Sequence, residues 1–114
     1  MKEPSCIFCK IAHKEIPSAT VLETDDVFAF RDLNPQAPVH VLVVPKAHLA
    51  RLSAASPADE ALLGKCVAAA AAVAKAEGLS SYRLVVNDGA DAGQSVFHLH
   101  VHVLGGRLFT WPPG

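Results

Sequence analysis

The chain has 114 residues, of which 51% are hydrophobic and 18% are charged. This length and balance predict a single globular domain, residues 1–114, with its own core. The net charge is −1 and the basic residues are scattered, which disfavours binding to a nucleic acid polymer. No apolar run reaches the roughly 20 residues of a membrane-spanning helix, and the N-terminus lacks the apolar stretch of a secretory signal. We therefore expect a cytoplasmic protein that does not bind membranes.

The first predicted element is a short helix around residues 6–13, which carries Cys6 and Cys9. Three cysteines in a chain without an export signal disfavour a disulfide framework. Cys-x-x-Cys is half of a tetrahedral zinc site, and the chain has no second pair, so histidines would have to complete it. Core packing and a redox pair are the alternatives for these two cysteines.

Three strands are predicted next, at residues 20–23, 27–31 and 40–44, because these segments are rich in Val, Leu and Phe. Asp25-Asp26 is a plausible turn that joins the first two strands into a hairpin. The segment 34–38 contains two prolines and is predicted to be a loop.

A long helix follows, and its start is well marked. Ser56 can cap it, Pro57 fits the first helical position, and Asp59 completes a Ser-x-x-Asp box. Helix formers continue to Glu77, and Gly78 supplies the stop, which corresponds to a helix of about 30 Å. The predicted apolar stripe of this helix consists of Leu63, Cys66, Val67, Ala70, Val73 and Ala74. The face opposite this stripe is rich in alanine, and we expect it to be solvated or to let another backbone approach closely.

Two further strands are predicted at residues 82–87 and 98–104, separated by a glycine-containing loop. The element order is then helix, three strands, long helix, two strands. This order predicts an α+β fold with a mainly antiparallel five-stranded sheet.

The last predicted strand alternates between imidazole and aliphatic side chains, and it holds three of the six histidines in the chain. Successive side chains of a strand point to opposite faces. His98, His100 and His102 should therefore line one face at spacings of about 6.5–7 Å, while the aliphatic residues between them face the core.

Two kinds of chemistry fit this row of histidines. Neutral imidazoles are common zinc ligands. Alternatively, one imidazole nitrogen attacks phosphorus while its neighbours orient it and move protons. The turn Gly93-Gln94-Ser95, just upstream, offers backbone amides and a hydroxyl that could hold phosphate oxygens, and it favours the second chemistry.

The pattern at 98–104 is the signature of the histidine triad (HIT) superfamily, His-φ-His-φ-His-φ-φ with φ apolar, and the chain resembles that superfamily over nearly its whole length. Other matching segments are Cys-Ile-Phe-Cys-Lys-Ile at 6–11, residues 30–40, Val44-Pro45-Lys46 with His48, Asn87, and residues 93–107. The ending Trp111-Pro112-Pro113-Gly114 resembles the Hint branch in particular.

The resemblance implies a homodimer that binds purine mononucleotides and hydrolyses nucleoside phosphoramidates, such as adenosine 5′-phosphoramidate or aminoacyl-AMP type adducts, to a nucleoside monophosphate and an amine. His100 would be the nucleophile that forms a nucleotidyl-histidine intermediate. His102 and Ser95 would sit beside the α-phosphate and the leaving group, and His40 would join the proton network. Because an amide anion leaves poorly, we expect a neighbouring protonated imidazole to supply its proton near neutral pH.

The resemblance also assigns residues to nucleotide binding. Asp32 would accept hydrogen bonds from the ribose hydroxyls, although an aspartate here could merely start a turn. Phe30 and nearby aliphatic residues would flank the purine. Trp111 would reach toward the active site of the partner subunit, or else pack on its own subunit. The phosphate would be positioned by Asn87, Gly93, Gln94 and Ser95.

Resemblance to the HIT proteins that carry Cys-x-x-Cys implies a structural zinc ion. Its ligands would be Cys6, Cys9, His48 and His98, and the ion would not be needed for the chemistry. A closed site of this kind would attach the N-terminal helix to the sheet. The third cysteine, Cys66, is expected to be buried packing.

Three other functions remain as alternatives. The first is hydrolysis of dinucleoside polyphosphates, as in the Fhit branch of the superfamily. The second is nucleotide binding or protein interaction without catalysis. The third is a zinc-dependent hydrolase that uses the three triad histidines as ligands.

Overall fold

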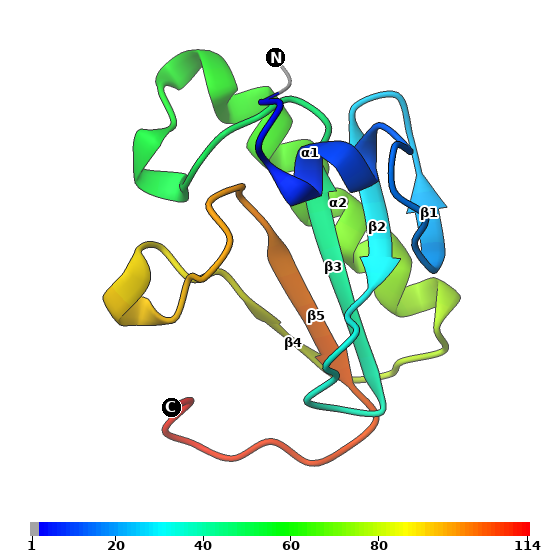
Figure 1. The fold of residues 1–114 in the computed structure, drawn as a ribbon. Coiled ribbons are helices and arrows are strands. Elements are labelled where there is room, and N and C mark those ends of the chain that lie inside the picture. The colour runs from blue at the N-terminus through cyan, green and yellow to red at the C-terminus, as the bar shows by residue number, and fades with distance from the viewer. Residues whose placement is uncertain (1–2) are drawn as a thin grey trace.

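The computed structural model describes residues 3–114 as one antiparallel sheet between a long and a short helix (Figure 1). The strands lie in the order β1-β2-β3-β5-β4, and every neighbouring pair is antiparallel. This confirms the predicted α+β class and the five-stranded sheet. The helices and strands are α1 (Ile7–Ala12), β1 (Thr20–Glu23), β2 (Val27–Arg31), β3 (Val39–Pro45), α2 (Glu60–Ala76), β4 (Tyr82–Val85) and β5 (Val101–Gly105).

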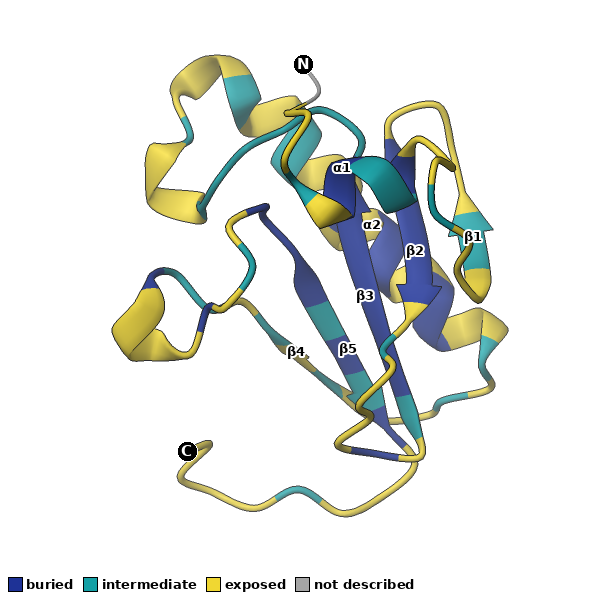
Figure 2. Ribbon diagram, in the orientation of Figure 1, coloured by how far each residue is buried: buried dark blue, intermediate teal, exposed yellow. Residues whose placement is uncertain are grey.

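The central strands β2 and β3 are buried along most of their length (Figure 2). Their side chains alternate between the two faces of the sheet, which creates two separate cores. One face of β2, β3 and β5 packs against α2 through small and β-branched side chains, among them Ala29, Val41 and Val103. The other face packs against α1 through Phe28, Phe30, Leu42 and Val44, together with Phe8 of the helix. The functional residues predicted from the sequence lie largely on this second, aromatic face.

The start of α2 follows the sequence signals. Ser56 and Asp59 form the predicted capping box around a single 3-10 turn, Pro57–Asp59, after which the α-helix runs to Ala76. Cys66 is 1% exposed in the core, as expected. The predicted stripe is wrong at Val67, which is 54% exposed, whereas Ala69 is buried. Because α2 carries apolar residues around much of its circumference, the sequence pattern alone did not decide which of them face the sheet. The sheet contacts the side that carries Ala69, which is smaller than Val67.

The last strand is shorter than predicted. The ladder with β3 begins at Val101, which pairs with Val43, so His98 and His100 precede β5 instead of lying within it. Two interactions replace the ladder here: the Leu99 amide donates to the carbonyl of Leu49 at 2.6 Å, and the His98 ring hydrogen-bonds to the carbonyl of Pro45 at 2.7 Å. The strand predicted at 82–87 also ends early, at Val85.

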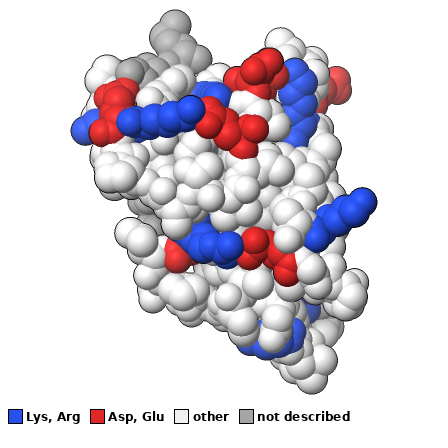
Figure 3. Space-filling model, turned by 90° about the vertical axis from the view of Figure 1, so that its right-hand side faces the viewer, with Lys and Arg blue, Asp and Glu red and all other residues white. Residues whose placement is uncertain are grey.

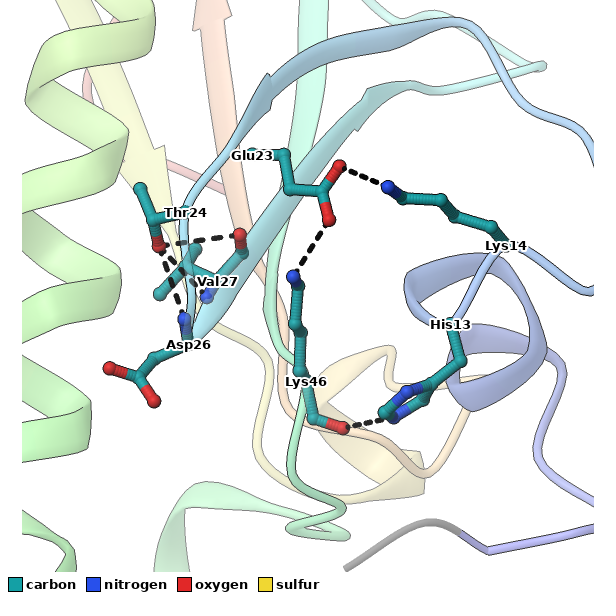
Figure 4. A network of polar contacts seen from close by, with 7 residues as sticks. All are labelled: His13, Lys14, Glu23, Thr24, Asp26, Val27 and Lys46. Atoms are coloured by element: carbon teal, nitrogen blue, oxygen red, sulfur yellow. Dashed lines mark hydrogen bonds and ion pairs between the residues drawn. The ribbon is translucent and has the colours of Figure 1, made fainter.

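A polar network attaches the end of α1 to the sheet (Figure 4). The Nε2–H of His13 donates to the Lys46 carbonyl at 3.0 Å. The carboxylate of Glu23 lies 2.9 Å from the ammonium of Lys14 and 2.7 Å from that of Lys46. Exposed ion pairs are individually weak, but these contacts together fix the C-terminal end of α1 beside β1 and β3.

Charged side chains of opposite sign lie next to one another on the face that Figure 3 presents, with no large area of one sign there. Two of the ion pairs are Lys65–Asp26 and Arg31–Glu77. Within residues 3–114, neither helix has the combination of length and hydropathy that crossing a bilayer requires.

Candidate functional site

A cleft of about 280 Å³ opens on the aromatic face of the sheet, beside α1. Its walls are largely apolar, but Asp32, Ser95, His100 and His102 also reach it. The cleft therefore combines a surface suited to a flat aromatic group with a few polar groups, which is the usual composition of a small-molecule site. The apolar lining residues are Ile7, Phe8, Ile11, Phe30, Leu33, Leu42 and Val96.

The three triad histidines share this face but have different surroundings. The ring centroids of His100 and His102 are 4.9 Å apart, closer than ideal strand spacing predicts. His98 is fully buried, at 0% exposure, and faces the two cysteines of α1. His102 faces His40 instead. Because the three rings diverge in this way, they do not form one common metal site.

His98 belongs to a group of four side chains that could hold a metal ion, here named the Cys–His cluster: Cys6, Cys9, His48 and His98. The His98 Nδ1 lies 3.3 Å from the Cys6 Sγ and 3.4 Å from the Cys9 Sγ, and the His48 Nδ1 lies 3.4 Å from the Cys9 Sγ. Standard Zn–S and Zn–N bond lengths at a tetrahedral angle place two such ligand atoms about 3.5 Å apart. The four residues therefore fit a tetrahedral zinc ion in both donor type and spacing.

The protonation of His98 suits a ligand. Its Nε2 faces the Pro45 carbonyl at 2.7 Å, and a carbonyl only accepts, so Nε2 carries the hydrogen and Nδ1 presents its lone pair to the cluster. Burial lowers the pKa of His98 to about 4, which keeps the ring neutral. Burial also raises the pKa of Cys9, so a thiolate there needs a cation.

His100 has the opposite tautomer. Its Nδ1 donates to the backbone carbonyl of His98 at 2.7 Å. The hydrogen is therefore on Nδ1, and Nε2 carries a free lone pair at the edge of the cleft. The ring of Phe8 packs edge-on against it, with centroids 5.1 Å apart. Phe8 was not predicted from the sequence, where its only signal is its place between the two cysteines.

A hydrogen-bonded chain of Asp32, His40 and His102, here named the proton relay, lies on the other side of His100. The His40 Nδ1 accepts a hydrogen bond from the backbone amide of Gln36 at 3.0 Å, so the hydrogen of His40 is on Nε2. That Nε2 lies 2.8 Å from the His102 Nδ1 and 3.4 Å from the Asp32 carboxylate. By the same reasoning His102 carries its hydrogen on Nε2, a buried atom without a hydrogen-bond partner in the described chain.

The relay is neutral at its histidines. Burial, and then the nearby rings of His100 and His40, lower the pKa of His102 to about 4. Burial also lowers the pKa of His40, against the opposing effect of Asp32. The lowered pKa values favour the neutral form of both rings in the free protein near pH 7. A protonated imidazole, the donor expected from the sequence, therefore requires a bound anion that raises the pKa of the pair.

Asp32 starts a turn, which is one of the two roles predicted for it from the sequence. One carboxylate oxygen accepts the Asn34 amide at 2.8 Å and stabilises a turn, and the other faces His40. The side chain also lines the cleft, close to Phe30 of β2.

The glycine turn before the histidines is built mainly from internal hydrogen bonds. The Gln94 side chain accepts from the Gly89 amide at 2.8 Å and donates to the carbonyls of Ala50 and Val96. Gly93 has a φ of +102°, which L side chains rarely adopt. Among the turn residues proposed for phosphate, Ser95 lines the cleft, whereas Asn87 lies against Gly93.

Two aromatic residues of the C-terminal tail are not among those that line the cleft. Trp111 is 81% exposed, so most of its surface is free of contacts within residues 3–114. In the same tail, Phe109 lies under the guanidinium groups of Arg83 and Arg107, with distances of 5.2 and 4.3 Å to the ring centroid. Arg31, the last residue of β2, binds Glu77, the residue that follows α2, through two hydrogen bonds of 2.7 and 3.0 Å.

The five-stranded sheet and the buried row of histidines together characterise a class of protein. Comparison with known proteins shows which class this is. Residues 13–108 match the HIT domain family, so the chain belongs to the HIT family. An uncharacterized HIT-like protein of Synechocystis is 58% identical over 109 residues, which cover 95% of this chain and 96% of that protein.

Solved structures agree with this assignment. A HIT family hydrolase from Legionella pneumophila superposes with a TM-score of 0.94 at 49% identity, covering 96% of this chain and all of that one. A zinc-bound histidine triad family protein from Mycobacterium smegmatis has a TM-score of 0.72 at 30% identity, covering 91% of this chain and 76% of that one.

Proposed function

We propose that this protein hydrolyses purine nucleoside phosphoramidates to a nucleoside monophosphate and an amine, with His100 as the nucleophile. The observation that carries the proposal is the pair of opposite tautomers beside the cleft. His100 presents an Nε2 lone pair, and its neighbour His102 presents an Nε2–H without a partner. A nucleophile next to a proton donor is what cleavage of a P–N bond requires. The naming of the Legionella relative as a hydrolase supports the reaction class.

In the first step the His100 Nε2 attacks the α-phosphorus and the P–N bond breaks. Before this step the hydrogen-bonded pair of His40 and His102 takes up one proton from solvent, which the negative charge of the bound phosphate and the Asp32 carboxylate favour. The departing nitrogen takes the proton from the His102 Nε2–H, so that it leaves as a neutral amine and the pair becomes neutral. The product of this step is a nucleotidyl-His100 intermediate.

In the second step water attacks the phosphorus and the P–N bond to His100 breaks. The water proton goes to the His102 Nε2, which lost its proton in the first step, so the relay returns to its starting state. His100 leaves as a neutral ring with its hydrogen still on Nδ1. The atoms balance as phosphoramidate plus water giving nucleoside monophosphate plus amine.

The cleft supports a purine nucleotide as the substrate. Phe8, Phe30 and Leu42 form an apolar wall for the base, and the Asp32 carboxylate is placed to accept hydrogen bonds from ribose hydroxyls. The Ser95 hydroxyl reaches the same cleft beside His100 and is suited to a phosphate oxygen.

The Cys–His cluster holds a zinc ion in this proposal. The zinc-bound Mycobacterium relative supports that choice of metal. When bound, the ion has four protein ligands and therefore no open position for substrate, so it cross-links α1 to the segments that carry His48 and His98. The protein is proposed to act as a homodimer, in which the exposed Trp111 of each subunit reaches the partner's active site.

The decisive experiment is to trap the covalent intermediate. Protein mixed with adenosine 5′-phosphoramidate and quenched within the first turnover should gain the mass of one AMP moiety, and peptide mapping should place it on His100. Diadenosine triphosphate, tested in parallel, should turn over more slowly. Tight AMP binding without any adduct or turnover would instead favour a non-catalytic nucleotide-binding protein.

A further inference from the structure

We propose that the Cys–His cluster positions the nucleophile: by fixing His98 and Phe8, a bound metal ion holds the His100 ring in its reactive orientation and tautomer. This inference rests on the proposed function for its kinetic consequence. Its structural part concerns only how one ring is held.

His100 needs such support because the sheet does not provide it. The ladder between β3 and β5 begins at Val101, and the backbone of residues 98–100 lies outside it. One backbone hydrogen bond, from Leu99 to Leu49, holds this segment to the segment that follows β3. The position of the His100 ring therefore depends on its own contacts with the His98 carbonyl, with Phe8 and with the ring of His102, and the first two of these connect it to the cluster.

The contact of His100 with the His98 carbonyl connects His100 directly to the Cys–His cluster. His98 is held at Nε2 by the Pro45 carbonyl, at 2.7 Å, and its Nδ1 faces the cysteine sulfurs. A ring fixed at both nitrogens restricts the rotation of its own backbone. The carbonyl of the same residue then stays aimed at the His100 Nδ1, which keeps the lone pair on Nε2.

The contact of His100 with Phe8 also connects His100 to the Cys–His cluster. Phe8 lies between the two cysteines in α1, and its ring contacts His98 and His100 at centroid distances of 6.2 and 5.1 Å. With six residues, α1 is too short to be stable alone. Its C-terminal end is attached through His13 and Lys46 (Figure 4). At its N-terminal end Phe8 packs on Phe30, with ring centroids 5.4 Å apart, and a metal ion bound by the cluster would add a second attachment there.

Cys6→Ser tests the inference without destroying the helix. The Cys6 Sγ now accepts the Cys9 amide as the helix N-cap, and serine is a good N-cap residue, so the variant keeps this bond and loses a thiolate ligand. The matched control is Cys66→Ala, which removes a thiol from the other core.

Zinc content, the kcat and KM for adenosine 5′-phosphoramidate, and the long-range ¹H–¹⁵N NMR spectrum of the His100 ring should be measured at one fixed pH. We expect zinc-loaded wild type and Cys66→Ala to show a single Nδ1–H tautomer of His100. Cys6→Ser should lose zinc, show averaged nitrogen signals for that ring, and have a kcat at least tenfold lower, with KM changed less than threefold. Phe8→Leu should keep the zinc and lose a smaller part of kcat.

Chelation of zinc from wild type, reversed by adding it back, provides the same test if Cys6→Ser does not fold. Zinc-free protein with an unchanged tautomer and kcat would overturn the inference. So would a loss confined to KM, because the cluster would then act on the nucleotide cleft alone. If zinc-loaded wild type has no turnover but its His100 signals still depend on zinc, the proposed function fails while the positioning stands.

Discussion

The two sides of His100 hold similar residues but are built for different tasks. On one side, the Cys–His cluster brings together two thiols and two imidazoles, the donor set of a structural zinc site. On the other, the ligand atoms of Asp32, His40 and His102 also lie within 4.8 Å of one another, but there His40 and His102 hydrogen-bond to each other at 2.8 Å and the His102 Nε2–H is left without a partner in the described chain. Thiolates suit a zinc ion, whereas a hydrogen-bonded pair of imidazoles suits proton transfer. The comparison shows that the partner of each histidine ring, more than its place in the motif, decides what that ring can do.

Replacing the residue between the two sides should have the largest effect. His100→Ala removes the nucleophile, and we expect kcat to fall by at least about 10³-fold. The cluster and the relay each keep their own contacts, so zinc content and the cooperativity of unfolding should be retained. Turnover within a few-fold of wild type would show that the chemistry does not depend on His100.

Breaking the relay should have the next largest effect. His102→Gln keeps an amide N–H but cannot exchange protons with His40, and we expect kcat to fall about 10²-fold. Zinc content should not change, because the Cys–His cluster does not include His102. Steady-state kinetics with a metal assay on the same sample would test both points. A variant that loses zinc together with activity would contradict the separation of the two sides.

Zinc binding to the cluster should raise the stability of the folded protein, and the relay should not change that increase. Free zinc at about 100 times its dissociation constant should raise the free energy of unfolding by about 2.7 kcal/mol if it binds only the folded state. Denaturant unfolding at fixed pH, with and without zinc, measures this difference. His102→Gln should respond as wild type does, and Cys6→Ser should respond far less. An equal response of wild type and Cys6→Ser would place the zinc elsewhere.

The relay should be visible in the pH dependence of stability. The pKa of His102 is lowered to about 4 in the folded protein, from an ordinary value of 6.5, so between these values the unfolded chain binds more protons than the native one. Its contribution is present above pH 6.5 and is lost as the pH falls toward 4. At pH 5 wild type should have lost about 2 kcal/mol more than His102→Gln, relative to pH 7.5. Parallel curves in excess zinc would contradict the lowered pKa.

Much of the fold could be predicted from local sequence signals. The hairpin at Asp25-Asp26, the capping box at Ser56 and the order of helices and strands along the chain were confirmed, because each depends on residues close in the chain. Two predictions were wrong where the sequence pattern fitted more than one arrangement about equally well. The wide apolar arc of α2 did not show that Val67 would be exposed, and the perfect alternation at 98–104 did not show that the ladder would begin only at Val101.

The candidate site, too, could be predicted only in part from the sequence. The sequence by itself determined that three imidazoles share one face and that two cysteines are spaced for a metal, because these are consequences of strand and Cys-x-x-Cys geometry. Only the tertiary structure decided which atoms meet: Cys6 and His98 are 92 positions apart, and the amide of Gln36 sets the tautomer of His40. Tautomers and pKa values depend on burial and on partners brought close in space, and neither is encoded in a local pattern.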